Sequence, residues 1–431
     1  MSDATTAASG PTPRPTPTEP RSYHFPTFER RTLPNGMRLV VAPVSKLPLV
    51  SITAVVDAGA SVEHDGEDGV ATLTAQLLLE GAGGLDGAAL IDRFERIGTS
   101  VDAHADWDAA TVSLTVLAER LPDALALVRD LLRTPEFPDR EVARLKDERL
   151  AELLQLRAEP GALADEHFAR AVYAPTARYA TLAGGNATSV RAMTRDVVRG
   201  FYKERYRPST TTLVFAGDVS VDRAAALTRE LFGDWEGAVE PTSARAVDAS
   251  PSTPLVRVVA KTDAPQSELR VGHAGLPRRH PDYFDTTVMN AVLGGLFSSR
   301  INLNLREVHG YTYGAFSAFE WRRAAGPFVI QTAVKSDVTG AAVREILREI
   351  ERMRSEEISA DELTLATSYL DGVFPIRYET TSAIATALSN LVIHDLPEHF
   401  YDDYRARVRE VTTEGVFFFL SFMPRPPPRP E

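Results

Sequence analysis

Hydrophobic and polar residues in the first half of the chain alternate in blocks that predict strands and helices in turn. Apolar runs on either side of Asn35-Gly36 predict a β-hairpin, because this dipeptide favours the tight turn that a hairpin needs. A further strand is predicted from Leu49 onward. A helix is predicted next, because apolar residues recur at helical spacing, and it is predicted to end at Gly81. The apolar positions of this helix are Val70, Leu73, Leu77 and Leu78.

The pattern continues to about residue 220 with alternating helices and strands. Residues 89–117 predict a helix, a turn at Gly98 and two strands, and residues 121–137 predict an amphipathic helix. A longer helix is predicted over residues 138–160, and residues 194–220 predict a helix, a turn at Pro208 and a strand. The residues expected to face inward on the longer helix are Val142, Leu145, Leu150, Leu153 and Leu154.

The second half repeats this order of elements. Strands are predicted over residues 255–263, 267–277 and 326–336, and helices over 343–359 and 361–378. Residues 193–198 of the first half resemble residues 411–416 of the second. A weak internal duplication of this kind predicts two copies of one α/β unit.

The stretch from Leu293 to Trp321 carries the candidate chemistry of the second half. Ser298 or Ser299 is predicted to cap a helix that ends at His309-Gly310, and a strand is predicted to follow. Ile301, Leu305 and Val308 are expected on one face of the helix, and Tyr311, Tyr313, Ala315, Ser317, Phe319 and Trp321 on one side of the strand.

Arg306 closes the predicted helix and Tyr313 opens the predicted strand, so both side chains can point into one space. A guanidinium and a phenol are hydrogen-bond donors that can hold a peptide carbonyl and stabilise the oxyanion formed when water attacks it. On spacing alone, an Arg in a surface ion pair and a Tyr in the core explain the same residues.

Composition narrows the class of protein. The chain has 431 residues, enough for two or more domains, and its hydrophobic (44%) and charged (25%) fractions are those of a globular protein. A formal net charge of −12 disfavours nucleic acid as a partner. With no cysteine there is no disulfide, thiolate nucleophile or cysteine-based zinc site.

The composition along the chain predicts its domain boundaries. Residues 1–22 are rich in Pro, Thr and Ala and predict a disordered tail, and residues 239–254 predict a linker between domains at 23–238 and 255–431. The tail lacks the apolar stretch of a signal peptide, and no run approaches the roughly 20 apolar residues of a membrane helix. We therefore expect no membrane association and a cytoplasmic location, or a periplasmic one if the start codon is misassigned.

The segment SSRINLNLREVHGYTYGAFS resembles the second-half signature of the pitrilysin/insulinase peptidases, in their mitochondrial-processing-peptidase branch. The resemblance extends from about residue 28 to residue 416. It implies an α+β fold of two homologous α/β-roll domains, each a mixed, mostly antiparallel sheet with helices on one face, which together form half of a clamshell. It also assigns Arg306 and Tyr313 to an active site whose zinc lies in another domain.

The resemblance further implies a His-x-x-Glu-His helix in the first half of a catalytic member. The two imidazoles would bind zinc and the Glu would act as general base. In this chain the corresponding positions hold Thr72, Ala75 and Gln76, none of which is a credible zinc ligand or base. Glu152 stands near the place of the third ligand, but alone it is explained equally by a solvated helix carboxylate.

Two histidines are further candidate site residues. His104 belongs to a strand that lies beside the substrate cleft in the resembled family, so it is predicted to contact peptide or to be an ordinary strand residue. His64, between Glu63 and Asp65, could hold a cation, but an exposed acidic loop is the simpler interpretation.

The resembled family therefore implies a zinc-less subunit that supplies Arg306 and Tyr313 to a homologous, zinc-bearing partner of a heterodimeric endopeptidase. No cofactor is expected in this chain, zinc is expected in the partner, and peptides are the expected substrates. Two alternatives remain: a non-enzymatic scaffold, as in the core subunits of the respiratory cytochrome complex, and a free-standing peptide-binding protein.

The end of the sequence departs from the duplicated pattern. In the first half the segment after Val198 contains a turn and a strand, whereas Val416 is followed by a Phe-rich and Pro-rich segment. Proline has no N–H for a sheet ladder. We therefore expect a C-terminal domain that is truncated at its end, lacks one strand and exposes the edge of its sheet.

Overall fold

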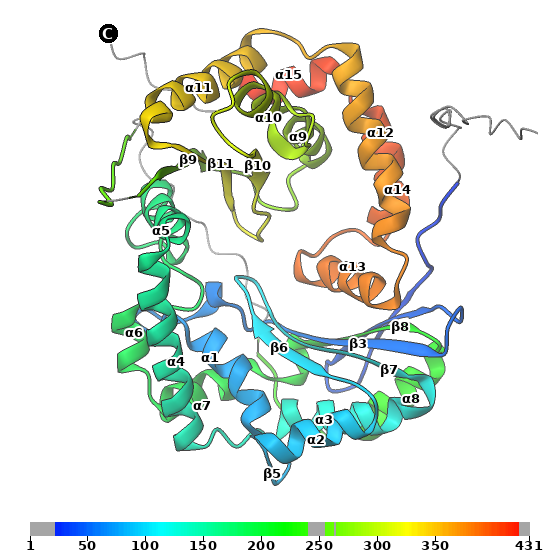
Figure 1. Cartoon of the computed structure of the whole chain (residues 1–431). Helices are drawn as coiled ribbons and strands as arrows, with labels where there is room; N and C mark the ends of the chain where they lie inside the picture. The colour runs from blue at the N-terminus through cyan, green and yellow to red at the C-terminus, as the bar shows by residue number, and fades with distance from the viewer. Residues whose placement is uncertain (1–21, 240–254, 263, 422–431) are drawn as a thin grey trace, which may run out of the picture.

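The computed structural model describes residues 22–239, 255–262 and 264–421. Two α/β halves face each other across the middle of the molecule, with the N-terminal half below and the C-terminal half above in Figure 1. The predicted tail and linker lie almost wholly outside the described residues. None of the described helices is long and apolar enough to cross a bilayer.

The N-terminal half contains a six-stranded sheet in the order β1-β2-β8-β3-β7-β6. The parallel β2–β8 pair is the exception in an otherwise antiparallel sheet. The predicted hairpin is present, and Gly36 has the positive φ (87°) that its turn requires. The strands are β1 (Glu29–Thr32), β2 (Arg38–Pro43), β3 (Leu49–Val56), β6 (Val101–Ala105), β7 (Ala110–Leu117) and β8 (Thr211–Gly217), and a small hairpin joins β4 (Gly81–Ala82) to β5 (Leu85–Asp86).

Helices α1, α2, α3 and α8 cover one face of this sheet and enclose the first hydrophobic core. The helices of this half are α1 (Val70–Leu77), α2 (Gly87–Arg96), α3 (Leu121–Arg133), α4 (Asp139–Ala158), α5 (Pro160–Val172), α6 (Ala187–Ala192), α7 (Arg195–Arg205) and α8 (Val221–Phe232). One inward prediction was wrong: Leu154 on α4 is 68% exposed. Its neighbour Leu153 is buried, because only one side of α4 contacts the rest of the domain.

The C-terminal half contains a three-stranded antiparallel sheet in the order β10-β11-β9. Its strands are β9 (Gln266–Ala274), β10 (Ala315–Phe319) and β11 (Pro327–Lys335). Its helices are α9 (Tyr283–Asn290), α10 (Arg300–Asn302), α11 (Thr339–Ser355), α12 (Ala360–Arg377), α13 (Thr381–Ile393), α14 (Phe400–Glu410) and α15 (Thr413–Ser421). The predicted fold class, α+β with two α/β domains, is confirmed.

The strand predicted over residues 255–263 is not formed by residues 255–262, the part that the structure describes. The corresponding strand of the first half, β2, is held by pairing with β1 and β8. In the C-terminal sheet no described residue takes the place of β8. A β-prone segment without a neighbouring strand has no partner for its backbone hydrogen bonds, so propensity alone does not make it a strand.

Each half packs one helix on the sheet of the other half. Helix α13 lies across β3 and β8, on the face opposite the first core, and joins their side chains to the core of the C-terminal half. Helix α5 lies across β9, where Phe168 faces Gly272. The N-terminal arm also crosses over: the ring of Phe25 stacks on Tyr401 with centroids 4.7 Å apart. The helices on one face of each sheet thus belong to its own half, and the helix on the other face comes from the opposite half.

The loop between β10 and β11 fastens the two halves with charged side chains. Arg323 pairs with Asp57, and its Nε donates to the carbonyl of Ile393 at 2.5 Å. The Arg323 backbone N–H donates to Asp108 at 2.8 Å. The Arg322 guanidinium lies over the ring of Trp107, 4.3 Å from its centroid. This loop therefore fixes how the two domains are oriented.

We predict that Arg323→Ala lowers the free energy of unfolding by about 1.5–3 kcal/mol, because it removes charge-assisted hydrogen bonds to Asp57 and to the Ile393 carbonyl. Chemical denaturation measures the change, and limited proteolysis between the domains should accelerate. Arg279→Ala is the matched control, because Arg279 pairs with Asp395 at the exposed surface and should cost less than about 1 kcal/mol. Equal losses in the two variants would contradict the prediction.

Candidate functional site

Helix α1 holds the three positions at which the family resemblance places zinc ligands and base. Thr72 is half-buried and Gln76 is exposed, and both lie on the side of the helix that is not packed in the core. Ala75 is fully buried and has no donor atom. This set of side chains does not fit a zinc ion, because a hydroxyl, a methyl group and an amide provide none of its preferred ligands.

Helix α4 packs against α1 and carries Glu152, the residue near the third-ligand position. Its carboxylate is exposed and pairs with Arg149 of the same helix at 2.9 Å. Among the described residues, no three His, Cys, Asp or Glu side chains are grouped so that they could bind a metal together. Glu152 is thus an ion-paired surface carboxylate in this structure.

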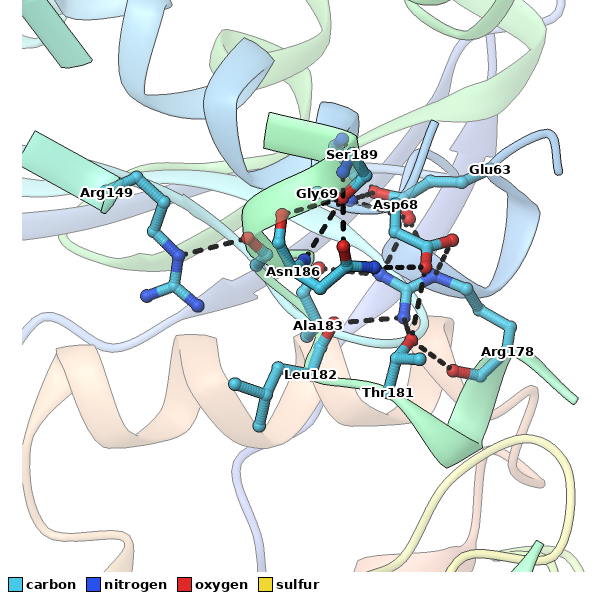
Figure 2. A network of polar contacts seen from close by, with 12 residues as sticks. Glu63, Asp68, Gly69, Arg149, Arg178, Thr181, Leu182, Ala183, Asn186 and Ser189 are labelled. Carbon is cyan, nitrogen blue, oxygen red and sulfur yellow. Dashed lines mark hydrogen bonds and ion pairs between the residues drawn. The ribbon is translucent and has the colours of Figure 1, made fainter. Parts of the chain in front are cut away.

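The start of α1 is fixed by a buried carboxylate, Glu63, which Figure 2 shows as part of a polar network around the Arg178 guanidinium. Glu63 accepts hydrogen bonds from the backbone N–H of Gly69 (3.1 Å) and Ala71 (2.9 Å). Arg178 Nη2 lies 2.7 Å from the same carboxylate. Burial raises the pKa of Glu63 to about 7, while the guanidinium and the N–H donors act in the opposite direction.

Arg178 extends this network to the loop at residues 181–186. It donates to Thr181 Oγ1 (2.6 Å) and to the carbonyls of Leu182 (3.0 Å) and Ala183 (2.8 Å). The loop approaches α1 so closely that a Cβ on Gly185 would lie 2.1 Å from the Asp68 carbonyl oxygen. This loop therefore supports the start of α1 closely, although the residues at the expected zinc-ligand positions of α1 cannot bind zinc.

Glu63 corrects one interpretation of the sequence. The loop that contains it was expected to be exposed and acidic, and His64 is exposed and pairs with Glu204 at 2.9 Å. Glu63 itself is 3% exposed. Its only signal in the sequence is an acidic residue shortly before a helix start, which is too common to identify a buried partner.

Arg306 lies on a π-helical turn, Leu303–Val308, that continues α10. The His309 N–H donates to the carbonyl of Asn304, five residues earlier, which defines the wider winding. This winding explains one wrong prediction: Ile301 and Leu305 are buried as expected, but Val308 is 74% exposed. The Arg306 guanidinium lies over the ring of Phe297, 4.5 Å from its centroid, and its Nε is 3.5 Å from Glu307.

Tyr313 lies in the loop before β10 and is 92% exposed. The predicted strand is shorter than expected, because Thr312 accepts a hydrogen bond from the Gly314 N–H (3.1 Å) and holds a turn there. Within the described residues the Tyr313 side chain makes no hydrogen bond and no ion pair. It is therefore not hydrogen-bonded to Arg306, whose guanidinium lies near Glu307 instead. The alternative interpretation of the sequence, in which Tyr313 lies in the core, is therefore wrong.

A buried asparagine links the two segments that carry Arg306 and Tyr313. Asn302 donates to the Phe297 carbonyl (2.6 Å) and accepts from the Ala315 N–H (3.1 Å). Arg300, at the start of the same helix, pairs with Glu362 at 2.6 Å and lowers the pKa of that carboxyl to about 2. The hydrogen bonds of Asn302 and the Arg300–Glu362 ion pair together hold the turn that carries Arg306.

His104 lies on β6, the edge strand of the N-terminal sheet, against which α1 packs. Its Nδ1 is 2.6 Å from Asp102, and the ring is exposed. It lines a cleft of about 490 Å³ between the N-terminal sheet, α13 and the β10–β11 loop. Hydroxyl groups of Thr53, Thr111 and Ser113 line the same cleft, together with the rings of Trp107 and Trp321.

Comparison with known proteins agrees with this architecture. Residues 40–185 match the family model described as insulinase (peptidase family M16), and residues 192–370 match that described as peptidase M16 inactive domain. A relative from Streptomyces coelicolor, named an uncharacterized zinc protease, is 22% identical over 90% of this chain and 86% of its own length.

Two solved structures share the fold. A peptidase M16 inactive domain from Pseudomonas fluorescens superposes with a TM-score of 0.84 at 24% identity, covering 91% of this chain and 94% of the other. A protease from Helicobacter pylori superposes with a TM-score of 0.86 at 17% identity, covering 92% of this chain and 96% of the other.

We predict that Glu63→Ala lowers the free energy of unfolding by about 2–4 kcal/mol, since it removes the closest ionic partner of Arg178 and leaves the buried N–H groups of Gly69 and Ala71 without their acceptor. Urea denaturation measures the loss. Glu152→Ala removes a carboxylate from an exposed ion pair nearby and should cost less than about 1 kcal/mol. A Glu63 variant as stable as the Glu152 variant would refute the structural role of the network.

Proposed function

Because this chain belongs to the insulinase (M16) peptidase family, we propose that it is the zinc-less, Arg/Tyr-bearing subunit of a heterodimeric zinc endopeptidase. Its partner would be a homologous chain that carries the zinc motif. The proposal assigns peptide degradation or processing to the pair and no cleavage to this chain alone.

One contrast carries the proposal. The ligand positions on α1 hold Thr72, Ala75 and Gln76, whereas Arg306 and Tyr313 are both present and Tyr313 is almost fully exposed. An exposed phenol without an internal hydrogen bond contributes little to the stability of its own domain. Its hydroxyl is free to donate to a group brought by another molecule.

Arg306 and Tyr313 would act on the carbonyl oxygen of the scissile peptide bond. Zinc in the partner supplies the Lewis acid and activates water when it is bound there. In this chain the guanidinium and the phenol would donate hydrogen bonds to the oxygen as it becomes negative. These donors only have to lie within about 3 Å of that oxygen, so a second subunit can supply them.

The cleft beside His104 would form part of the chamber wall. Its hydroxyl groups and the exposed imidazole can bond to the backbone of an extended peptide without selecting its side chains. His394 also lines the cleft, and burial lowers its pKa to about 3, so its ring is neutral at physiological pH. Because His104 is exposed and lines this cleft, we assign peptide binding to it.

The two alternative functions, a scaffold and a peptide-binding protein, would use the same fold without a catalytic role. A scaffold would need neither Arg306 nor Tyr313, and a peptide-binding protein would need the cleft alone. A neighbouring gene that encodes a His-x-x-Glu-His homologue would favour the heterodimer over both. A cytoplasmic location remains a prediction.

We predict that Arg306→Ala and Tyr313→Phe each lower the turnover of the chain in complex with its zinc-bearing homologue by about 10²–10³-fold. The reason is the loss of one oxyanion donor while the zinc remains in place. Steady-state peptide hydrolysis by the co-purified pair measures kcat for each variant.

Tyr369→Phe is the matched control, because Tyr369 is an exposed tyrosine on α12 and should leave turnover unchanged. The isolated chain should neither retain stoichiometric zinc nor cleave the peptide. Unchanged turnover in both site variants of an active pair would reject the catalytic role and favour the scaffold. Chelator-sensitive cleavage by the isolated chain would reject the subunit assignment.

A further inference from the structure

The Arg306 side chain is held by the face of its guanidinium group and not by its hydrogen-bonding edge. The guanidinium carbon lies over the Phe297 ring, 4.5 Å from the ring centroid. Among the described residues its polar contact is with Glu307, 3.5 Å from Nε, and the side chain of Arg306 makes no hydrogen bond there. The N–H groups on both Nη atoms can therefore donate to a molecule from outside this chain.

A cation–π contact orients a guanidinium without occupying its donors. The attraction acts between the face of the ring and the face of the planar cation, whereas the N–H groups point outward in the plane of the cation. A carboxylate would orient the group as well, but it would accept the hydrogen bonds itself. Glu362 does this to Arg300, at 2.6 Å from Nε and 2.9 Å from Nη2. Phe297 thus fixes the plane of the Arg306 guanidinium and leaves its edge open.

The stack of Phe297 on Arg306 lies at the surface, unlike other stacked arginines of this half. Phe297 is 64% exposed, and the Arg306 side chain is 35% exposed. Arg278 and Arg322, which also lie over aromatic rings, are 8% and 7% exposed. An exposed cation–π contact adds little to the stability of a domain. Stability of the fold therefore does not explain why a phenylalanine is placed at position 297.

The backbone is fixed on both sides of the stack. The Phe297 carbonyl accepts a hydrogen bond from the buried Asn302 side chain at 2.6 Å. On the side of Arg306, the Asn304 side-chain amide donates at 2.6 Å to Glu349 of α11, whose carboxylate is buried. The ring and the guanidinium therefore project from two supported segments, which keeps the stack in place.

We propose that Phe297 is a positioning residue for Arg306: its ring holds the guanidinium in the orientation that donates to the carbonyl oxygen of a bound peptide. The inference rests on the function proposed above, in which Arg306 is that donor. Phe297 acts only through Arg306. A peptide that covers the stack removes water from it, and a desolvated cation–π contact is stronger than an exposed one. The ring would thus hold Arg306 most firmly in the complex that reacts.

The first test of the stack uses the isolated full chain with 15N-labelled arginine. The ring current of Phe297 should shift the Nε–H signal of Arg306 upfield, and the loss of this signal in Arg306→Lys identifies it. Phe297→Tyr keeps an aromatic ring and should keep the shift. Phe297→Leu keeps an apolar side chain without a ring and should abolish it. A signal that stays in place in Phe297→Leu would overturn the proposal.

The second test measures peptide hydrolysis by the co-purified pair. We expect Phe297→Leu to lower kcat by about tenfold, since a desolvated cation–π contact is worth roughly one such factor. KM should change less than about twofold, because the orientation of Arg306 matters most in the transition state. Phe297→Tyr should restore kcat. A lower kcat in both variants, or unchanged kcat with weaker assembly of the pair, would overturn the positioning role; the second result would make Phe297 a subunit contact.

A double-mutant cycle separates an effect through Arg306 from an independent one. In the Arg306→Ala background, Phe297→Leu should cause no further loss of kcat, because the ring then has no guanidinium to hold. An equal loss in both backgrounds would overturn the proposal. A normal loss in Arg306→Ala with none in Phe297→Leu would reject the positioning role alone. If Arg306→Ala left turnover unchanged, the proposed function would fail, and the positioning role with it.

Discussion

The exchange of helices between the two halves is the constraint on which the arrangement of the molecule depends. Helix α13 closes the second face of the N-terminal sheet, and α5 covers the second face of the C-terminal sheet. The buried side chains of β2, β3 and β8 on that face are therefore part of the C-terminal core. Neither half can bury its apolar surface without the other, so the two domains form one structural unit. Arg323 adds orientation to this packing, since its ion pair and hydrogen bonds are directional.

This constraint would explain how the zinc-less subunit proposed above keeps its shape without zinc ligands on α1. Helix α1 is held by the buried Glu63–Arg178 pair, so its position does not depend on the side chains of Thr72, Ala75 and Gln76. The turn that carries Arg306 is held separately by Asn302 and Arg300. Because the two supports share no residue, one set of functional groups can be lost while the other is retained. A composite active site that is divided between subunits needs this independence.

Sequence patterns predicted the local elements well wherever the signal was local. The Asn35-Gly36 hairpin, the helix from Val70 and the turn at Gly310 depend on residue preferences that act within a few positions. The predictions failed where contacts with residues distant in the sequence determine the local conformation. Val308 is exposed because a π-helical turn interrupts the α-helical period, and residues 255–262 are not a strand because no strand among the described residues pairs with them. The position of α13 on the opposite sheet could not be predicted, because an apolar face does not identify its partner. Of the candidate site, the identities of Arg306 and Tyr313 came from the motif, but the exposure of Tyr313 came only from the structure.

The most direct measurement is a structure of this chain bound to its zinc-bearing homologue and an uncleavable peptide analogue. The account predicts that the Arg306 guanidinium and the Tyr313 hydroxyl both lie about 3 Å from the peptide oxygen that faces the partner's zinc. A complex in which both groups lie beyond hydrogen-bonding distance of that oxygen, more than about 4 Å away, would contradict it.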